Sequence, residues 1–165
     1  FGGPAAKKSS RPAAKSGAAS RPAKQPAKEE EPRVAAAEDW ESFQATAASL
    51  RREIEKRAAA MSQGPVGTRA VELASLRLAA SGRNLVDAGS LDGALEVLQR
   101  AVSLYGGNGY AYLYLAYVHH VQGRPERAAE FAASARRHLP RDKPVQAELE
   151  GLRLSIRQGA AAGSS

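Results

Sequence analysis

The residues best suited to chemistry lie in one stretch, GYAYLYLAYVHH, which runs from Gly109 to His120 and holds four of the five tyrosines. Each phenol ring offers a large rigid surface and a hydroxyl group that can bond a peptide backbone, which suits recognition of a partner. The stretch ends in His119 and His120, and adjacent residues of a helix point about 100° apart, so both cannot bind one metal ion. Because the chain has no cysteine and no two histidines four residues apart, we predict no metal site.

Other combinations of reactive side chains are equally weak. Asp92 and Glu96 are four residues apart, which is typical of one solvated face of a helix. No serine lies in a nucleophile-elbow pattern, and no glycine-rich phosphate loop follows a strand. We therefore predict a protein that is not an enzyme and that has no cofactor.

The tyrosines could belong to a strand or to a helix, because Tyr110, Tyr112 and Tyr114 fall on alternate positions. No other segment alternates in this way, so a strand here would have no partner. On a helix the tyrosines lie on two opposite faces, and neighbouring residues of the sequence lie on these faces with them. One face contains Tyr110, Leu113, Tyr114, Tyr117, His120 and Val121, and the opposite face contains Tyr112, Ala116 and His119.

Helices also account for the rest of the domain, so the predicted fold class is all-α. From Trp40 to Met61 apolar residues recur every three or four positions, which predicts an amphipathic helix that stops at Gly64-Pro65. Its other face mixes acids and bases, so we expect the apolar stripe to pack on the domain and not on a membrane. Further helices are predicted over 68–87, 91–104, 109–122, 125–138 and 143–157.

The beginning of the chain differs in composition from the rest. Residues 1–33 contain five of the nine prolines and, after Phe1, no large apolar side chain, so they cannot offset the entropy of ordering. Residues 1–28 hold seven bases and no acid, which accounts for the formal net charge of +7. We predict a disordered basic Ala/Pro/Lys-rich tail over 1–33 and a helical domain over 34–165. From Glu29 onward 17 bases face 17 acids, so we expect no positive surplus for a folded nucleic-acid site.

Two parts of the domain repeat each other at an offset of 34 residues. Gly89 corresponds to Gly123 and Ala94 to Ala128. Both parts consist of a helix, a glycine break and a second helix rich in small residues. Small side chains at these positions let neighbouring helices approach closely.

This period and this glycine-alanine pattern resemble the tetratricopeptide repeat family. The resemblance implies a helix-turn-helix solenoid of two repeats, 75–108 and 109–142, with an extra N-terminal helix and a capping helix over 143–157. The residues expected to form the repeat core are Leu78, Gly82, Leu85, Gly89, Ala94, Leu98, Ala101, Tyr112, Ala116, His119, Gly123, Ala128 and Ala135.

The resemblance also implies that the first helices of the repeats line a concave groove that binds a peptide segment of a partner. A subclass of the family grips a terminal carboxylate there, but the corresponding residues Ala79, Arg83 and Tyr114 do not form such a clamp. We expect an apolar and aromatic guest, either helical or extended, unless the helix over 143–157 covers the groove. The predicted lining is Leu76, Ala79, Arg83, Val86, Asp87, Tyr110, Leu113, Tyr114, Tyr117, His120 and Val121.

A basic arm that leads to helical repeats resembles, in overall plan, bacterial envelope lipoproteins, among them a tetratricopeptide lipoprotein that activates a bifunctional penicillin-binding protein. The resemblance implies a monomeric periplasmic protein, held at the outer membrane by a lipid, whose partner is an inner-membrane peptidoglycan synthase. We expect any targeting signal or lipid-bearing cysteine to lie upstream of Phe1. A pilus-assembly adaptor and a cytoplasmic adaptor are alternatives. A further alternative is a recruitment protein whose basic tail binds a polyanion.

Overall fold

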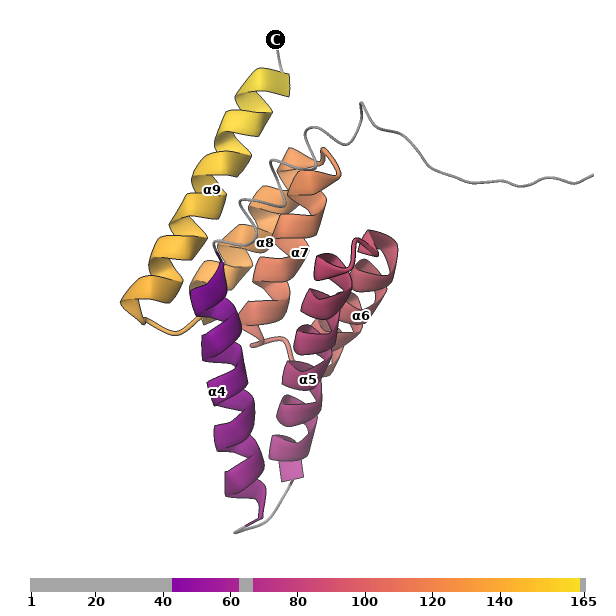
Figure 1. The fold of residues 1–165 in the computed structure, drawn as a ribbon, viewed down its shortest axis with the longest axis vertical. Coiled ribbons are helices and arrows are strands. Elements are labelled where there is room, and N and C mark those ends of the chain that lie inside the picture. The colour runs from indigo at the N-terminus through magenta and orange to yellow at the C-terminus, as the bar shows by residue number, and fades with distance from the viewer. Residues whose placement is uncertain (1–42, 63–66, 164–165) are drawn as a thin grey trace, which may run out of the picture. The chain divides into compact units, whose positions relative to one another are not determined.

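The computed structural model describes residues 43–62 and 67–163, so the predicted tail over 1–33 and Trp40 lie outside the described residues. The described residues belong to one compact unit, Asp39–Ser165, and contain helices but no strand. The helices are α4 (Gln44–Met61), α5 (Gly67–Asp87), α6 (Leu91–Leu104), α7 (Gly109–Val121), α8 (Pro125–His138) and α9 (Lys143–Gly163) (Figure 1). The predicted all-α helical-repeat fold is therefore confirmed, and the tyrosine stretch is helical.

The same turn closes both helix pairs, α5 with α6 and α7 with α8. Gly89 and Gly123 have positive φ angles of 83° and 78°, a backbone conformation that glycine adopts without steric cost. The amide of Gly89 donates to the carbonyl of Val86 at 2.9 Å, and that of Gly123 donates to the carbonyl of His120 at 3.1 Å. This is the glycine cap that ends many helices. It places both turns of the repeat at the positions that the sequence predicts.

The interior of each repeat is made of small and aliphatic side chains. Ala94, Leu98 and Ala101 of α6 are fully buried against α5, and α8 buries an alanine at the equivalent positions 128, 132 and 135. A side chain added at Gly82 of α5 would collide with Leu98, so the two helices of the first pair need a glycine where they meet. These contacts hold the paired helices close together.

Polar groups join the two repeats at one end. Asn108 caps α7 by accepting a hydrogen bond from the amide of Ala111 at 3.1 Å. Its side-chain nitrogen donates to the carbonyl of Ser75 at 3.1 Å, and the Ser75 hydroxyl donates to the carbonyl of Ala101 at 2.6 Å. This buried network fixes the start of α7 against α5 and α6.

The last helix, α9, packs on α8 and α7, and it extends six residues beyond the predicted end at 157. Its apolar stripe is buried as the sequence pattern requires. No described helix has the length and apolar character needed to cross a membrane. The buried stripe consists of Val145, Leu149, Leu152 and Ile156.

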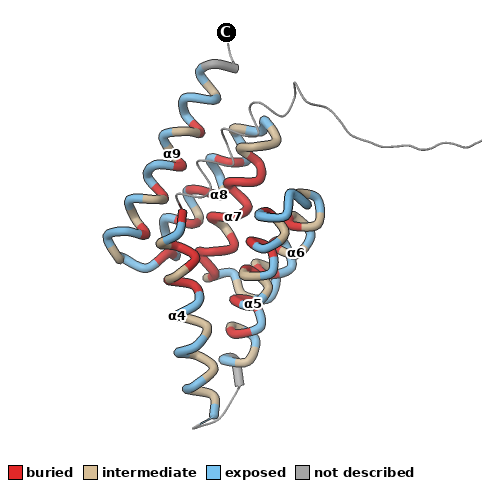
Figure 2. The backbone as a smooth tube through the Cα atoms, in the orientation of Figure 1, coloured by how far each residue is buried: buried red, intermediate tan, exposed pale blue. Residues whose placement is uncertain are grey.

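The first described helix, α4, lies across the first helices of the array instead of extending the array at its end. It contacts α5 and α9, and its first half also contacts α7 (Figure 1). Burial is concentrated on α7 and on the first half of α4, whereas the second half of α4 is exposed or half-buried (Figure 2). Phe43 occupies the N-cap position of α4, and the helix ends at Met61, the last residue of the predicted apolar stripe.

Candidate partner-binding face

We call the side of α5, α7 and α9 that α4 covers the inner face. It contains the tyrosines that the sequence assigns to a groove, either open or covered by the helix over 143–157, but Tyr110 and Tyr117 are only 4 % exposed and Tyr114 is fully buried. The prediction that these rings line an open groove is therefore wrong. The physical reason is that α4 of the same chain lies on them.

Two contacts of α4 with the tyrosines define this cover. The ring of Phe43 meets the ring of Tyr117 edge to face, with the centroids 6.3 Å apart and the planes at 79°. Further along α4, the hydroxyl of Ser49 shares a short, buried hydrogen bond with the hydroxyl of Tyr110. In these two contacts α4 meets the ring of Tyr117 and the hydroxyl of Tyr110.

The N-terminal turn of α4 is held by a carboxylate from another helix. Glu148 of α9 accepts hydrogen bonds from the backbone amides of Ala45 at 2.6 Å and Thr46 at 3.1 Å. The first amides of a helix have no partner within the helix, and this end of the helix dipole is positive. Glu148 therefore acts as an N-cap supplied from outside α4.

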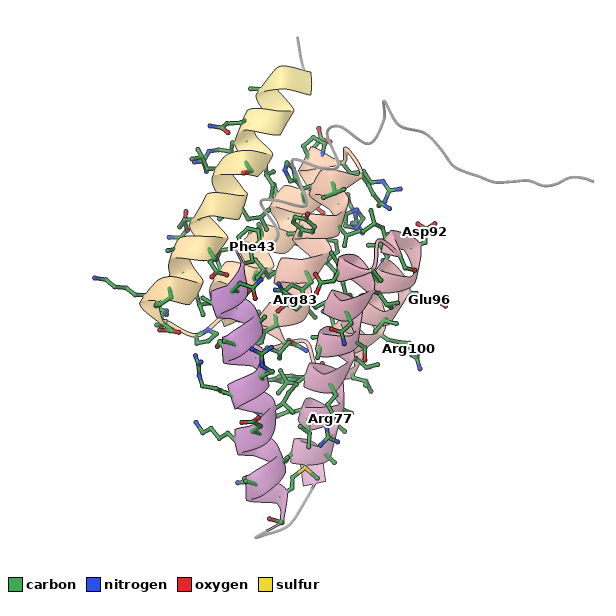
Figure 3. The ribbon with its side chains drawn as sticks, viewed as in Figure 1. Phe43, Arg77, Arg83, Asp92, Glu96 and Arg100 are labelled. Atoms are coloured by element: carbon green, nitrogen blue, oxygen red, sulfur yellow. The ribbon has the colours of Figure 1, made fainter. Side chains whose placement is uncertain are left out.

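On the other side of the same turn, Arg83 of α5 binds the backbone carbonyl of Phe43. Its Nη1 atom donates to that oxygen at 3.0 Å, and Figure 3 shows Phe43 and Arg83 close to each other where α4 begins. The guanidinium also lies over the ring of Tyr114, 5.7 Å from the centroid, and pairs with Asp87 at 3.8 Å. Arg83 is 7 % exposed, so a buried cation binds the backbone at the start of α4.

Burial changes the acidity of the tyrosines on the inner face. It raises the pKa of Tyr114 to about 12, and Arg83 and Thr46 lower this pKa only in part. Burial also raises the pKa of Tyr110, against the smaller opposing effect of the hydrogen bond with Ser49. Both phenols therefore keep their protons at neutral pH, and the hydroxyl of Tyr110 is bonded to Ser49.

The structure brings most of the other predicted groove residues to the same face. Asp87 is exposed, and His120 and Val121 are half-buried toward the end of α7. The predicted lining residues that are buried together with the tyrosines are Leu76, Ala79, Val86 and Leu113.

The opposite face of α7 carries the second set of predicted residues, and here burial departs from prediction at Tyr112. Tyr112 is half-buried, whereas the sequence predicts it in the repeat core. Its ring stacks on Phe131 with centroids 6.3 Å apart and on His138 with centroids 5.8 Å apart. Tyr112 thus lies at the edge of the contact between α7 and α8, where aromatic rings replace the aliphatic side chains of the first repeat.

Most of the other predicted core residues are buried or half-buried. His119 is buried and stacks on Phe131, with the centroids 5.3 Å apart. Gly89 and Gly123 are exposed, because they form the turns between helices and not the packed interior. Leu78 and Leu85 are half-buried, and the remaining core predictions that the structure buries are Gly82, Ala94, Leu98, Ala101, Ala116, Ala128 and Ala135.

Three residues of the inner-face contact were not predicted: Thr46, Ser49 and Glu148. Phe43 belongs to the apolar stripe that was predicted to pack on the domain. Thr46 and Ser49 interrupt the apolar stripe of α4, and Glu148 lies beside the apolar stripe of α9. Polar residues on or beside a buried stripe need partners, so their positions were the available signal. The pattern does not say which helix supplies the partner.

The residues considered for catalysis and metal binding do not come together. Asp92 and Glu96 are exposed, and Figure 3 shows them with Arg100 on the outer side of α6, away from α4. Within the described ranges 43–62 and 67–163, no group of three or more His, Asp or Glu side chains is placed to hold a metal ion.

Charge is not balanced within the helical part. Residues 43–163 contain 16 Lys and Arg residues and 11 Asp and Glu residues, a formal charge of +5. Six of the 17 acids that follow residue 28 lie between Glu29 and Glu41, and they make the sum from Glu29 onward neutral. The inference that the helices have no positive surplus is therefore wrong. Four exposed bases, Arg136, Arg137, Arg141 and Lys143, gather where α8 ends and α9 begins.

Comparisons with known proteins bear on the repeats alone. No curated protein and no solved structure matches the chain. Residues 85–151 match the family model described as tetratricopeptide repeat, and these residues run from the end of α5 through α6, α7 and α8 into α9. The glycine turns, the buried alanines and this match together support the assignment of the repeat region to the tetratricopeptide repeat family.

Proposed function

We propose that this chain is a non-enzymatic protein-interaction module that holds a helical segment of a partner protein on its inner face. Tetratricopeptide repeats are in general protein-binding modules, and residues 85–151 match that family. The observation that carries the proposal is that α4 packs against the first helices of the array. An amphipathic helix bound in a groove is a common mode of peptide recognition.

The chemistry of the inner face supports this use. Its contacts with α4 include a phenol-hydroxyl bond, a carboxylate on backbone amides and an arginine on a backbone carbonyl. Aromatic residues and arginine are enriched at the centres of protein interfaces.

A photo-crosslinking experiment on the full chain tests this proposal. A photoreactive residue replaces Asp87, which is exposed at the edge of the inner face, in one variant and Glu96 on the outer side of α6 in another. A true partner is crosslinked from position 87 and not from position 96, and it then binds the purified chain. Partners that crosslink only from position 96 would place binding on the outer surface and contradict the proposal.

The variants used to weaken partner binding must respect the burial of the tyrosines. Alanine at Tyr110, Tyr114 and Tyr117 together would remove three buried rings and unfold the domain. Tyr110→Phe keeps the ring and removes the hydroxyl that Ser49 uses. A partner helix that bonds this hydroxyl should lose affinity to Tyr110→Phe by about 1 kcal/mol, measured by calorimetry. Tyr112→Phe, on the opposite face of α7, is the matched control.

For the identity of the partner, we propose a penicillin-binding protein, with this chain as an activator anchored to the outer membrane in the periplasm. The support is the resemblance in overall plan, a proline-rich basic stretch of 33 residues followed by helical repeats. The test measures glycan polymerisation by a purified bifunctional synthase, with and without the full chain. No change in rate would remove this proposal and would leave other adaptor roles, such as pilus assembly.

A second candidate function has one observation in its favour. The helical part carries a formal charge of +5, and four exposed bases lie together where α8 ends and α9 begins. A polyanion could bind there and to the basic tail, with an affinity that falls steeply as salt rises. Titration with a nucleic acid and with anionic vesicles at low and moderate salt tests this candidate. Arg136→Gln/Arg137→Gln would weaken polyanion binding and leave binding of a partner helix unchanged.

A further inference from the structure

We infer that the ligand of the inner face is an α-helix whose N-terminal turn enters between Arg83 and Glu148, and that α4 occupies the place of this ligand. The inference rests on the proposed function and specifies the class of partner segment. It predicts that a second helix with the chemistry of α4 binds when α4 leaves.

The argument for a helix comes from what Arg83 and Glu148 touch. Glu148 accepts two consecutive backbone amides, those of Ala45 and Thr46, and Arg83 donates to the backbone carbonyl of Phe43. None of these bonds uses a side chain of α4. Consecutive amides that point the same way and lack an internal partner are found at the first turn of a helix. An extended peptide turns successive amides to opposite sides and cannot satisfy Glu148 in this way.

The side chains of α4 show what else the ligand must offer. Phe43 places an aromatic ring on Tyr117, and Ser49 places a hydroxyl on Tyr110. Ala47 and Leu50 are buried on the same side of the helix. After Leu50 the residues of α4 are exposed or half-buried. The ligand pattern is therefore an aromatic residue at the N-cap, a small residue four positions later, a hydroxyl after six and leucine after seven.

The contact between α4 and the inner face combines the buried apolar side chains Phe43, Ala47 and Leu50 with several polar contacts. Its polar groups are ones that water can satisfy when α4 leaves, and polar contacts of this kind are typical of interfaces that form and separate. The fully buried positions of α6 and α8 in the repeat interiors are alanine and leucine, whose exposure to water is unfavourable. We expect these alanine-leucine interiors to hold the repeats together when α4 leaves, although release also exposes Leu76, Val86 and Leu113.

The experiment uses the full chain with a weakened α4 and a peptide that copies α4. Phe43→Ala/Leu50→Ala, which we call the released chain, removes the two large side chains that α4 places on the inner face. The probe is a fluorescein-labelled peptide with the unsubstituted sequence of residues 43–62. We expect saturable binding to the released chain, at least about tenfold tighter than to the unsubstituted chain, whose own α4 must first leave.

Matched variants test the two backbone contacts. In the released chain, Glu148→Gln should weaken the peptide about fivefold, because one helix-cap acceptor is lost. Arg83→Gln should weaken it about tenfold or more, because a charge-assisted hydrogen bond is lost. Glu150→Gln is the control, since Glu150 lies on the exposed side of α9 and pairs with Arg153. It should leave affinity unchanged.

A second peptide separates helical from extended ligands. Ala48→Pro in the peptide keeps the side chains that touch the inner face but breaks the helix. This peptide should fail to bind the released chain. Equal binding of the two peptides would overturn the inference that the inner face requires a helix.

Circular dichroism establishes that the released chain is folded, and Ser49→Ala/Leu50→Ala serves as a milder release if it is not. A folded released chain that does not bind the peptide overturns the inference, as does equal binding in the Glu148→Gln and Glu150→Gln forms. The proposed function fails separately, if the peptide binds as expected but no protein partner competes with it.

Discussion

The interiors of the two repeats and the inner face beneath α4 are both buried, but they are built from different residues. The interiors place alanine and leucine against glycine, as at Leu98 and Gly82. The inner face places phenols, a carboxylate and a guanidinium against the backbone and hydroxyls of α4. Both regions bury apolar side chains, and buried polar groups also join the repeats at Asn108 and Ser75. The inner face differs because its polar side chains bind the backbone of α4.

The largest expected effect comes from replacing one buried leucine by alanine, either in a repeat interior or on α4 at the inner face. Leu98 is fully buried in the first repeat and Leu50 is 2 % exposed on the inner face. Leu98→Ala should lower the free energy of unfolding by about 2–5 kcal/mol, because the cavity cannot close. Leu50→Ala should speed amide hydrogen exchange in α4 and leave α7 and α8 protected.

Urea denaturation and hydrogen exchange measure these two results, with Leu154→Ala as the control. Leu154 is 48 % exposed, so its loss should change stability by less than about 0.5 kcal/mol. If Leu50→Ala exposed α7 and α8 as much as α4, the two regions would unfold as one unit and the comparison would fail.

A smaller effect is expected at the hydrogen bond between Ser49 and Tyr110. Ser49→Ala and Tyr110→Phe each remove one partner, and the double variant removes both. The coupling energy from this cycle should be about 1 kcal/mol, measured by thermal or urea unfolding. A coupling near zero would show that the hydroxyls contribute packing but no bond to the inner face.

Replacing a glycine by alanine should lower the stability of the protein in a repeat turn but raise it within α9. Gly123 has a φ of 78°, so Gly123→Ala should cost about 1 kcal/mol by strain although there is space for the added methyl group. Gly151 lies within α9 with nothing near its Cβ position, so Gly151→Ala should stabilise the protein by about 0.5–1 kcal/mol. Thermal unfolding measures both changes. A gain in stability at Gly123 would mean that the turn does not hold the repeat frame.

The smallest effect is expected at His119 and only in acid. Burial lowers the pKa of His119 below 6.5, and Arg124 and Arg127 lower it further. The unfolded chain then binds the proton more readily, so the stability that His119 contributes is present above pH 6.5 and is lost as pH falls through the lower folded-state pKa. Unfolding midpoints at about pH 7 and about pH 5 should differ less in His119→Tyr than in the unsubstituted chain. An unchanged difference in His119→Tyr would contradict this assignment.

The helices and their ends follow from local signals that the sequence displays. Gly89, Gly123 and Pro125 mark the turns, and the predicted spans agree with α5 to α8 within one residue. The spacing of the apolar residues from Val145 to Ile156 predicts the buried stripe of α9. These features depend on neighbours in the chain, so a single sequence suffices for them.

The inner face could not be predicted in the same way, because burial there depends on contacts between distant helices. Periodicity places Tyr110, Tyr114 and Tyr117 on one side of α7, but it does not say which side is covered. The apolar stripe of α4 predicts that this helix packs on the domain and does not name the surface. The contact of Glu148 with Ala45 joins residues 103 positions apart, beyond any local pattern.

The short connection between α4 and α5 has a consequence for any partner. Only five residues separate Met61 from Gly67, and Arg57 of α4 pairs with Glu72 of α5 near this connection. A released α4 would therefore stay beside its binding face at an effective concentration of about millimolar. A competing helix must overcome that concentration, so the module would remain closed to weak or dilute partners and respond only above a threshold.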